Sequence, residues 1–213
     1  MPAGLIIYND HGTILIDENY TNMSVVSSGM VTTADVGITE ETKYAATLPF
    51  MPAAGEKIAL RSSLYCMVQG NEVVASGEGI VYWYRFGAPV MSNNNAGLRI
   101  FNAAGQLTFD SGRQCARVSG SVSGSIYTPS SQTFTPGRVY AVIQGRRGVR
   151  CTRKRYNDGF GNLYFAKTFR STASRVNGAS IEWSEVVSHF YVSDNPEWAS
   201  PNYSAYVVDV TGY

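Results

Sequence analysis

Polar and apolar residues alternate over several short segments of this chain, a pattern typical of strands with one buried face. The segment EKIALRS at 56–62 alternates in this way, and GIVYWYRFG at 79–87 is an aromatic run bounded by glycines. No segment of about twelve residues or more keeps the apolar period of an amphipathic helix. The pattern therefore predicts an all-β protein, built as an antiparallel β-sandwich or sandwiches with long hairpins and little helix.

Turn-forming residues separate these segments and predict how they are joined. LYCMVQGNEVVASG at 64–77 indicates two strands around a Gly-Asn turn, and residues 149–171 indicate a long hairpin around Asn-Asp-Gly. Residues 181–194, IEWSEVVSHFYVSD, fit a strand or a short helix over WSEVV. Residues 119–137 are rich in Ser, Thr, Pro and Gly, which favours a long surface loop or loosely paired strands.

One phrase of fourteen residues occurs twice. GLIIYNDHGTILID spans 4–17 and GLRIFNAAGQLTFD spans 97–110, with six identical positions and three more of similar character. Two copies are too few for a solenoid, which needs about three repeats. The repetition predicts two β units, 1–92 and 93–213, each opening with one copy; the alternative is one sandwich spanning 1–213.

Each copy has the turn chemistry of a short hairpin. Asn9 and Gly12 occupy the first and fourth turn positions of one copy, and Asn102 and Gly105 those of the other. Asparagine bonds the backbone two residues on and glycine adopts positive φ, so we expect a type I turn that closes on a bulged glycine. The two residues between them change from Asp-His to Ala-Ala. Both copies keep the residues that set the turn geometry, and the second copy lacks the reactive side chains. This pattern indicates a structural hairpin and not a chemical site.

Composition narrows the class of protein. The chain has 213 residues, enough for a sizeable core, and 15% charged residues against a usual quarter or so. The net charge of +1 gives no general attraction to nucleic acid or membranes. We expect no membrane insertion, since no apolar stretch approaches about 20 residues, and no export signal. Three widely spaced cysteines, Cys66, Cys115 and Cys151, favour free thiols, although one disulfide is possible.

One basic segment stands out in this weakly charged chain. Residues 146–155 contain six of the seventeen Lys and Arg residues, and aromatic residues follow. The first interpretation is a solvent-facing arm whose charges protect a strand edge. Contact with a partner subunit or an anionic glycan comes second, and nucleic-acid binding third. The candidate contact residues are Arg153, Lys154, Arg155 and Tyr156.

Aromatic residues raise a second question of contact. Trp83 and Trp198 are candidates for stacking on sugars, although aromatic strands are more often part of a core. The YWY run at 82–84 presents both faces of its strand, so at least one face is covered by another layer or offered for binding.

Catalytic and cofactor motifs are not found in the sequence. It has two histidines, no CxxC or HExxH pair for zinc, and no GxSxG nucleophile motif. We therefore expect no catalytic residue, no cofactor and no metal ligand. Paired carboxylates for glycoside hydrolysis stay open, because their spacing is spatial and not sequential.

The repeated phrase resembles the opening hairpin of small proteins encoded near the tail-tip and host-specificity genes of tailed bacteriophages. Those proteins commonly begin with a GLxVFNxxGxxxxD-like phrase. The resemblance covers two short segments, and the positions that carry it are Gly4, Leu5, Tyr8, Asn9, Gly12 and Asp17 in one, and Gly97, Leu98, Phe101, Asn102, Gly105 and Asp110 in the other.

This resemblance implies a structural virion protein, assembled in the host cytoplasm and placed at the tail tip, in a tail fibre or at its attachment. Its partners would be other tail proteins and copies of itself, as a trimer by analogy with other tail parts, with a host-surface glycan or protein as a further contact. A carbohydrate-binding module is the alternative function, and a small glycan-degrading enzyme is the third.

Overall fold

A computed structural model describes residues 6–8, 14–17, 21–37, 42–94, 96–128, 130–157, 163–192 and 198–213. These residues form strands, turns and loops, with no helix among them, so the all-β prediction is confirmed. The strands are β1 Ile6–Tyr8, β2 Ile14–Asp17, β3 Ser24–Asp35, β4 Tyr44–Thr47, β5 Lys57–Arg61, β6 Cys66–Gln69, β7 Glu72–Ala75, β8 Gly79–Gly87, β9 Arg99–Phe101, β10 Leu107–Asp110, β11 Arg117–Ser125, β12 Ser130–Thr133, β13 Tyr140–Gln144, β14 Val149–Asn157, β15 Leu163–Asn177, β16 Ser180–Val192, β17 Trp198–Ser200 and β18 Asn202–Asp209.

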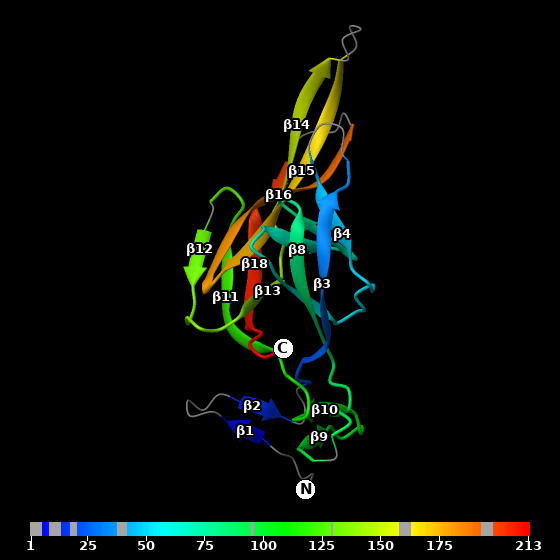
Figure 1. The fold of residues 1–213 in the computed structure, drawn as a ribbon, viewed down its shortest axis with the longest axis vertical. Coiled ribbons are helices and arrows are strands. Elements are labelled where there is room, and N and C mark those ends of the chain that lie inside the picture. The colour runs from blue at the N-terminus through cyan, green and yellow to red at the C-terminus, as the bar shows by residue number, and fades with distance from the viewer. Residues whose placement is uncertain are drawn as a thin grey trace.

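One large antiparallel sheet of fourteen strands curls into two facing layers (Figure 1). One layer runs in the order β11-β18-β13-β5-β8-β3, and the other runs β4-β7-β6-β15-β14-β17 with β16 paired to β15 and β12. Strand β3 belongs to both because it pairs with β8 and with β4. The pairing of β13 with β5 joins strands from before and after residue 93. The division at residue 93 therefore does not separate the strands of this sheet.

The core lies between the two layers and gives the sheet its curl. At one place Leu60 and Trp83 from β5 and β8 pack against Cys66 and Val73 from β6 and β7. A second cluster packs β13 and β18 against β16 through Val142, Val207, Trp183 and other buried side chains. Burial of these apolar surfaces is the main force that holds the layers together.

Trp83 belongs to this core and does not form part of the surface. Its side chain is 6% exposed, and its ring meets Phe50 edge-on with the centroids 4.9 Å apart. Across the sheet, a Cβ atom at Gly29 would lie 2.6 Å from Trp83 Cζ2, so glycine is what leaves room for the indole. A tryptophan enclosed in this way cannot stack on a sugar.

The outer face of β8 is also covered along part of its length. Tyr84 is 6% exposed, because the ring of the C-terminal Tyr213 packs over it and over Phe86, with centroids 6.3 Å from each. Tyr82, two residues before Tyr84, is 38% exposed. The aromatic strand therefore has one face in the core and another that is only partly covered.

The two copies of the repeated phrase form two small hairpins with the same register. In β1-β2 the pairs are Ile6 with Asp17, Ile7 with Ile16 and Tyr8 with Ile14, interrupted by a bulge. In β9-β10 the aligned positions pair in the same way, with the bulge at the same place. Both hairpins lie at the lower end of the molecule in Figure 1. The sequence repeat is therefore a repeat of backbone structure.

The turn of the second hairpin has tightly bonded geometry. The Asn102 carbonyl accepts a hydrogen bond from the Gly105 amide at 2.9 Å, and Gly105 has φ of +75°. The Asn102 side-chain oxygen accepts from the amides of Ala104 and Gln106, at 3.0 and 2.9 Å. The turn of the first copy, with Asn9 and Gly12, lies outside the described residues.

The β14-β15 hairpin projects from the opposite end of the sandwich (Figure 1). Nine consecutive residue pairs join its strands, from Val149 with Ser171 to Asn157 with Leu163. The segment 181–194, for which a strand and a short helix were both expected, continues as strand β16 through Val192. Residues 119–137 contain paired strands, β11 against β18 and β12 against β16.

Candidate functional site

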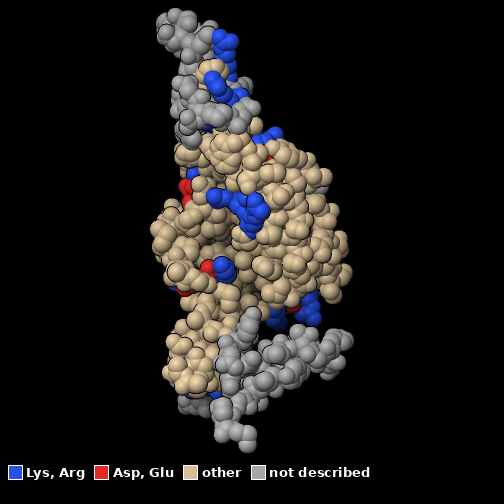
Figure 2. All heavy atoms as spheres, turned by 180° about the vertical axis from the view of Figure 1, so that it is seen from behind, with Lys and Arg blue, Asp and Glu red and all other residues tan. Residues whose placement is uncertain are grey.

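The projecting hairpin carries the basic segment on a narrow arm (Figure 2). On the face shown, Lys and Arg side chains gather along this arm, while most of the surface below it is uncharged. Arg155 is exposed, and the Arg153 guanidinium lies 3.3 Å from the centroid of the Phe165 ring. A ring beneath a guanidinium orients it by cation–π attraction. The side chains of Lys154 and Tyr156 lie outside the described residues.

Trp198 lies at the base of this arm and is exposed, unlike Trp83. It pairs with Cys151 where β17 meets β14, and 49% of its side chain is accessible. Its ring meets Phe169 edge-on at 5.9 Å, which fixes its orientation. Arg153, Arg155 and Trp198 therefore form a mixed basic and aromatic surface, called here the arm surface.

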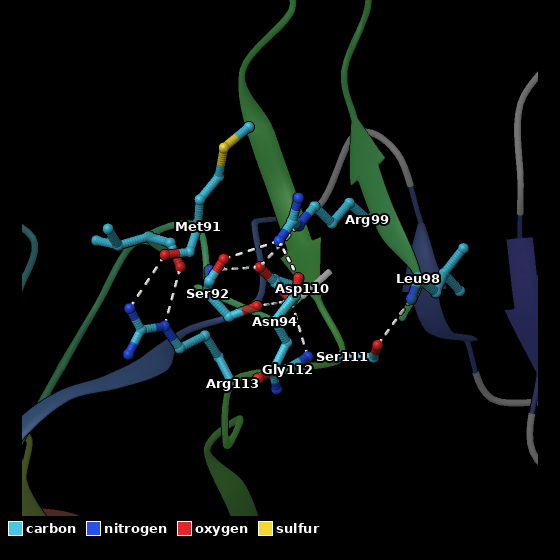
Figure 3. Close-up of polar contacts among 10 residues, drawn as sticks. Met91, Ser92, Asn94, Leu98, Arg99, Asp110, Ser111, Gly112 and Arg113 are labelled. Carbon is cyan, nitrogen blue, oxygen red and sulfur yellow. Dashed lines mark hydrogen bonds and ion pairs between the residues drawn. The ribbon is translucent and has the colours of Figure 1, made fainter. Parts of the chain in front are cut away.

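A second polar site lies at the other end of the chain's long axis, where Asp110 ends β10 (Figure 3). The Asp110 side chain is 2% exposed. Its oxygens accept hydrogen bonds from the Ser92 amide at 2.7 Å and the Ser92 hydroxyl at 3.0 Å. They also accept from the Gly112 amide at 2.7 Å and from Arg99 Nε at 3.2 Å. These four residues are called the Asp110 network.

Two arginines extend the network to the loop before β9 (Figure 3). Both donate to backbone carbonyls of residues 90–94, which are thereby held against the β9-β10 hairpin. The bonds run from Arg99 Nη2 to the carbonyls of Ser92 and Asn94 at 2.8 and 2.7 Å, and from Arg113 to those of Val90 and Met91 at 3.1 Å each.

This arrangement suits a structural role for Asp110 and not a chemical one. A carboxylate has about four lone-pair sites, and four donors occupy them here. No oxygen is left to take a proton from a substrate or to bind a metal ion. The sequence marked Asp110 only as a residue kept in both copies. Its partner Arg99 carried no such signal, because Ile6 stands at the aligned position of the first copy.

The network makes acid stability depend on Asp110. Chiefly through the hydrogen bond from the Ser92 amide, the pKa of Asp110 is lowered to about 2 from an ordinary 3.8. We expect its contribution to stability to be complete above pH 4 or so, to decline as pH falls, and to be lost near pH 2. Carboxyl NMR titration measures the pKa directly. An Asp110 carboxyl that titrates near 3.8 in the folded protein would contradict the prediction.

Burial holds two of the three cysteine thiols in their protonated form. None of Cys66, Cys115 and Cys151 forms a disulfide. Burial raises the pKa of Cys66 to about 12 and also raises that of Cys115. A thiol held protonated reacts slowly, since the thiolate is the nucleophile.

Comparison of the chain with protein-family models, curated proteins and solved structures found no match. Within the described ranges, no group of three or more His, Cys, Asp and Glu side chains is placed to hold a metal ion. The same residues include no helix of the length and apolarity needed to cross a membrane.

Proposed function

We propose that this chain is a structural protein of a bacteriophage tail, acting by assembly at the tail tip or in a fibre and contacting the host surface. The observation that carries the proposal is the hairpin built twice in one register. The register recurs while the two residues inside the turn change from Asp-His to Ala-Ala, as expected of a unit that is kept for its shape. The likeness of its phrase to phage tail proteins supports the same function.

The distribution of surface features also supports assembly. The duplicated hairpins lie at one end of the long axis, and the arm surface lies near the other (Figure 1). An elongated unit with contact features at both ends is suited to joining two neighbours. Exposed arginine and tryptophan are the side chains that contribute most to protein interfaces.

Detection in virions tests this proposal. Purified particles of a phage that encodes the chain should contain it, by mass spectrometry and by antibody labelling at the tail. The isolated protein should form oligomers in light scattering at high concentration. A strict monomer that stays in the lysate and is absent from purified particles would overturn the proposal.

Reversing one charge tests the arm surface. We expect Arg155→Glu to lower incorporation into particles about tenfold, because a carboxylate there repels an acidic partner. Lys57→Glu makes the same charge change at an exposed position of β5 and should leave incorporation unchanged. Quantitative mass spectrometry of purified particles measures both. Equal incorporation of the two variants would exclude the arm surface as an assembly contact.

A further inference from the structure

A groove distinct from the arm surface and from the Asp110 network runs past three arginines. A depression of about 460 Å³ is lined by Arg61, Tyr82, Arg138 and Tyr140, among others. A neighbouring depression of about 660 Å³ shares Arg138 and Tyr140 with it and continues to Arg117. The two depressions adjoin at Arg138 and Tyr140, and together they are called here the arginine groove.

Arg61 is the arginine that points to a ligand. Its guanidinium lies 4.3 Å from the centroid of the Tyr82 ring, and its Nε–H is buried with no hydrogen-bond partner. Arg85, Arg150 and Arg153 also have a buried Nε without a hydrogen-bond partner. Arg85 and Arg150 form ion pairs with Glu56 and Glu185 at 2.7 and 2.6 Å, and Arg153 lies on the arm over the Phe165 ring. Arg61 has no carboxylate partner among the described residues. No carboxylate of the described residues balances the Arg61 charge, and an anionic ligand in the groove would balance it.

The other two arginines share a single carboxylate. Asp209 is 3% exposed, with Arg138 at 2.6 Å and Arg117 at 3.5 Å. Burial by itself raises the pKa of Asp209. Hydrogen bonds from Thr211 and Arg138 and the charge of Arg117 outweigh this effect, so the pKa is lowered overall and the group stays ionised at neutral pH. One negative charge against three positive ones leaves the arginine groove with an excess of positive charge. An anion is therefore attracted along its length.

The remaining lining suits a sugar chain. Tyr82 contributes a ring that is 38% exposed beside Arg61. Hydroxyl groups of Ser63, Ser119 and Thr133 line the two depressions. Aromatic rings pack on the apolar faces of sugars, and hydroxyl and guanidinium groups bond their polar edges. An acidic peptide would use the charge but not this combination of ring and hydroxyls.

We propose that the arginine groove binds an acidic oligosaccharide, with Arg61 bonding a carboxylate or phosphate group and Tyr82 packing against the adjoining sugar. This inference deepens the proposed function and rests on it, since it names the host-surface chemistry that the tail protein contacts. Arg117 and Arg138 contact further anionic groups of the same chain. Planar guanidinium groups recognise carboxylate and phosphate by paired hydrogen bonds, so both chemistries fit.

Calorimetric titration of the full chain tests the groove with four probes. Oligogalacturonate supplies carboxylates on sugar rings, a phosphorylated mannan supplies phosphates on sugar rings, dextran is neutral and polyglutamate is an acidic peptide. We expect one or both acidic glycans to bind, dextran and polyglutamate not to bind, and binding to weaken in high salt. The stronger of the two acidic glycans identifies the anionic group. Absence of binding to both, or equal binding of dextran or polyglutamate, would overturn the inference.

Single variants then locate the site. Arg61→Ala should weaken the binding of the acidic glycan about tenfold or more, and Arg61→Lys should restore only part of it, because lysine lacks the planar fork. Arg138, with a side chain 53% exposed, provides a second variant, Arg138→Ala, if Arg61→Ala proves unstable. Arg155→Ala removes one charge from the arm surface and should change affinity less than about twofold. Loss of binding in Arg155→Ala but not in Arg61→Ala or Arg138→Ala would place the glycan on the arm and refute the groove.

The two proposals fail separately. Incorporation into particles tests the structural function, and glycan titration tests the arginine groove. Incorporation without glycan binding would remove the groove and leave the structural proposal in place. An Arg61→Ala protein that enters particles normally but no longer binds the glycan is the result expected if both are correct.

Discussion

Trp83→Ala should destabilise the protein by about 3–5 kcal/mol, the usual cost of deleting an aromatic side chain from a core. The indole is 6% exposed and fills the space between the two layers beside Phe50 and above Gly29. For a chain of this size, each kcal/mol lowers the melting temperature by roughly 2–4 °C. Thermal and urea unfolding, followed by circular dichroism, measure the loss.

Trp198→Ala is the matched control, because it removes the same side chain from a position that is 49% exposed. We expect it to cost about 1 kcal/mol or less, through the lost contact with Phe169. Equal destabilisation by the two substitutions would show that Trp83 does not hold the layers together. Any glycan binding lost in Trp83→Ala but kept in Trp198→Ala would follow from unfolding and not from a missing contact.

Asp110→Asn should release the loop at 90–94 from the β9-β10 hairpin. The Ser92 amide bonds one carboxylate oxygen and the Gly112 amide the other, so the asparagine NH2 group faces one of these two amides as a second donor. The substitution also removes the charge that strengthens both bonds and that Arg99 neutralises. Hydrogen exchange at these two amides should become faster on the order of a hundredfold, as loss of a charge-assisted bond predicts. Exchange followed by NMR measures this residue by residue.

Asp35→Asn controls for the general effect of removing a carboxylate. Asp35 is exposed at the end of β3, and its side chain accepts one hydrogen bond, from the Gly37 amide at 2.8 Å. We expect little change in exchange at Ser92 or Gly112 in this variant. Unaltered exchange in Asp110→Asn as well would mean that the arginine contacts alone hold the loop.

The strands were predictable because their residues alternate and glycines bound them. GIVYWYRFG at 79–87 became β8 with the same bounds, and LYCMVQGNEVVASG became β6 and β7. The segment around WSEVV was ambiguous, since a short apolar run fits a strand or a helix. Its pairing along β15 decided the outcome, and that pairing depends on residues far away in the sequence.

The sites were harder to predict, because each depends on how the sheet curls. Trp83 and Trp198 both lie on strands, and alternation alone does not tell which strand face meets the second layer. The Asp110 network joins a strand end to a loop that has no motif of its own. The arginine groove is lined by residues from β5, β11 and β13. Its three arginines lie singly in the sequence, outside the basic segment 146–155.

The matching register of β1-β2 and β9-β10 suggests how such a chain diversifies. Two hairpins with the same backbone register can each carry different side chains without a change of backbone structure. In the second hairpin Arg99 and Asp110 bind the loop at 90–94, whereas the first copy has isoleucine at the position of Arg99. The two hairpins therefore share a backbone register, and the arginine that binds the loop is present in the second copy of the phrase and not in the first.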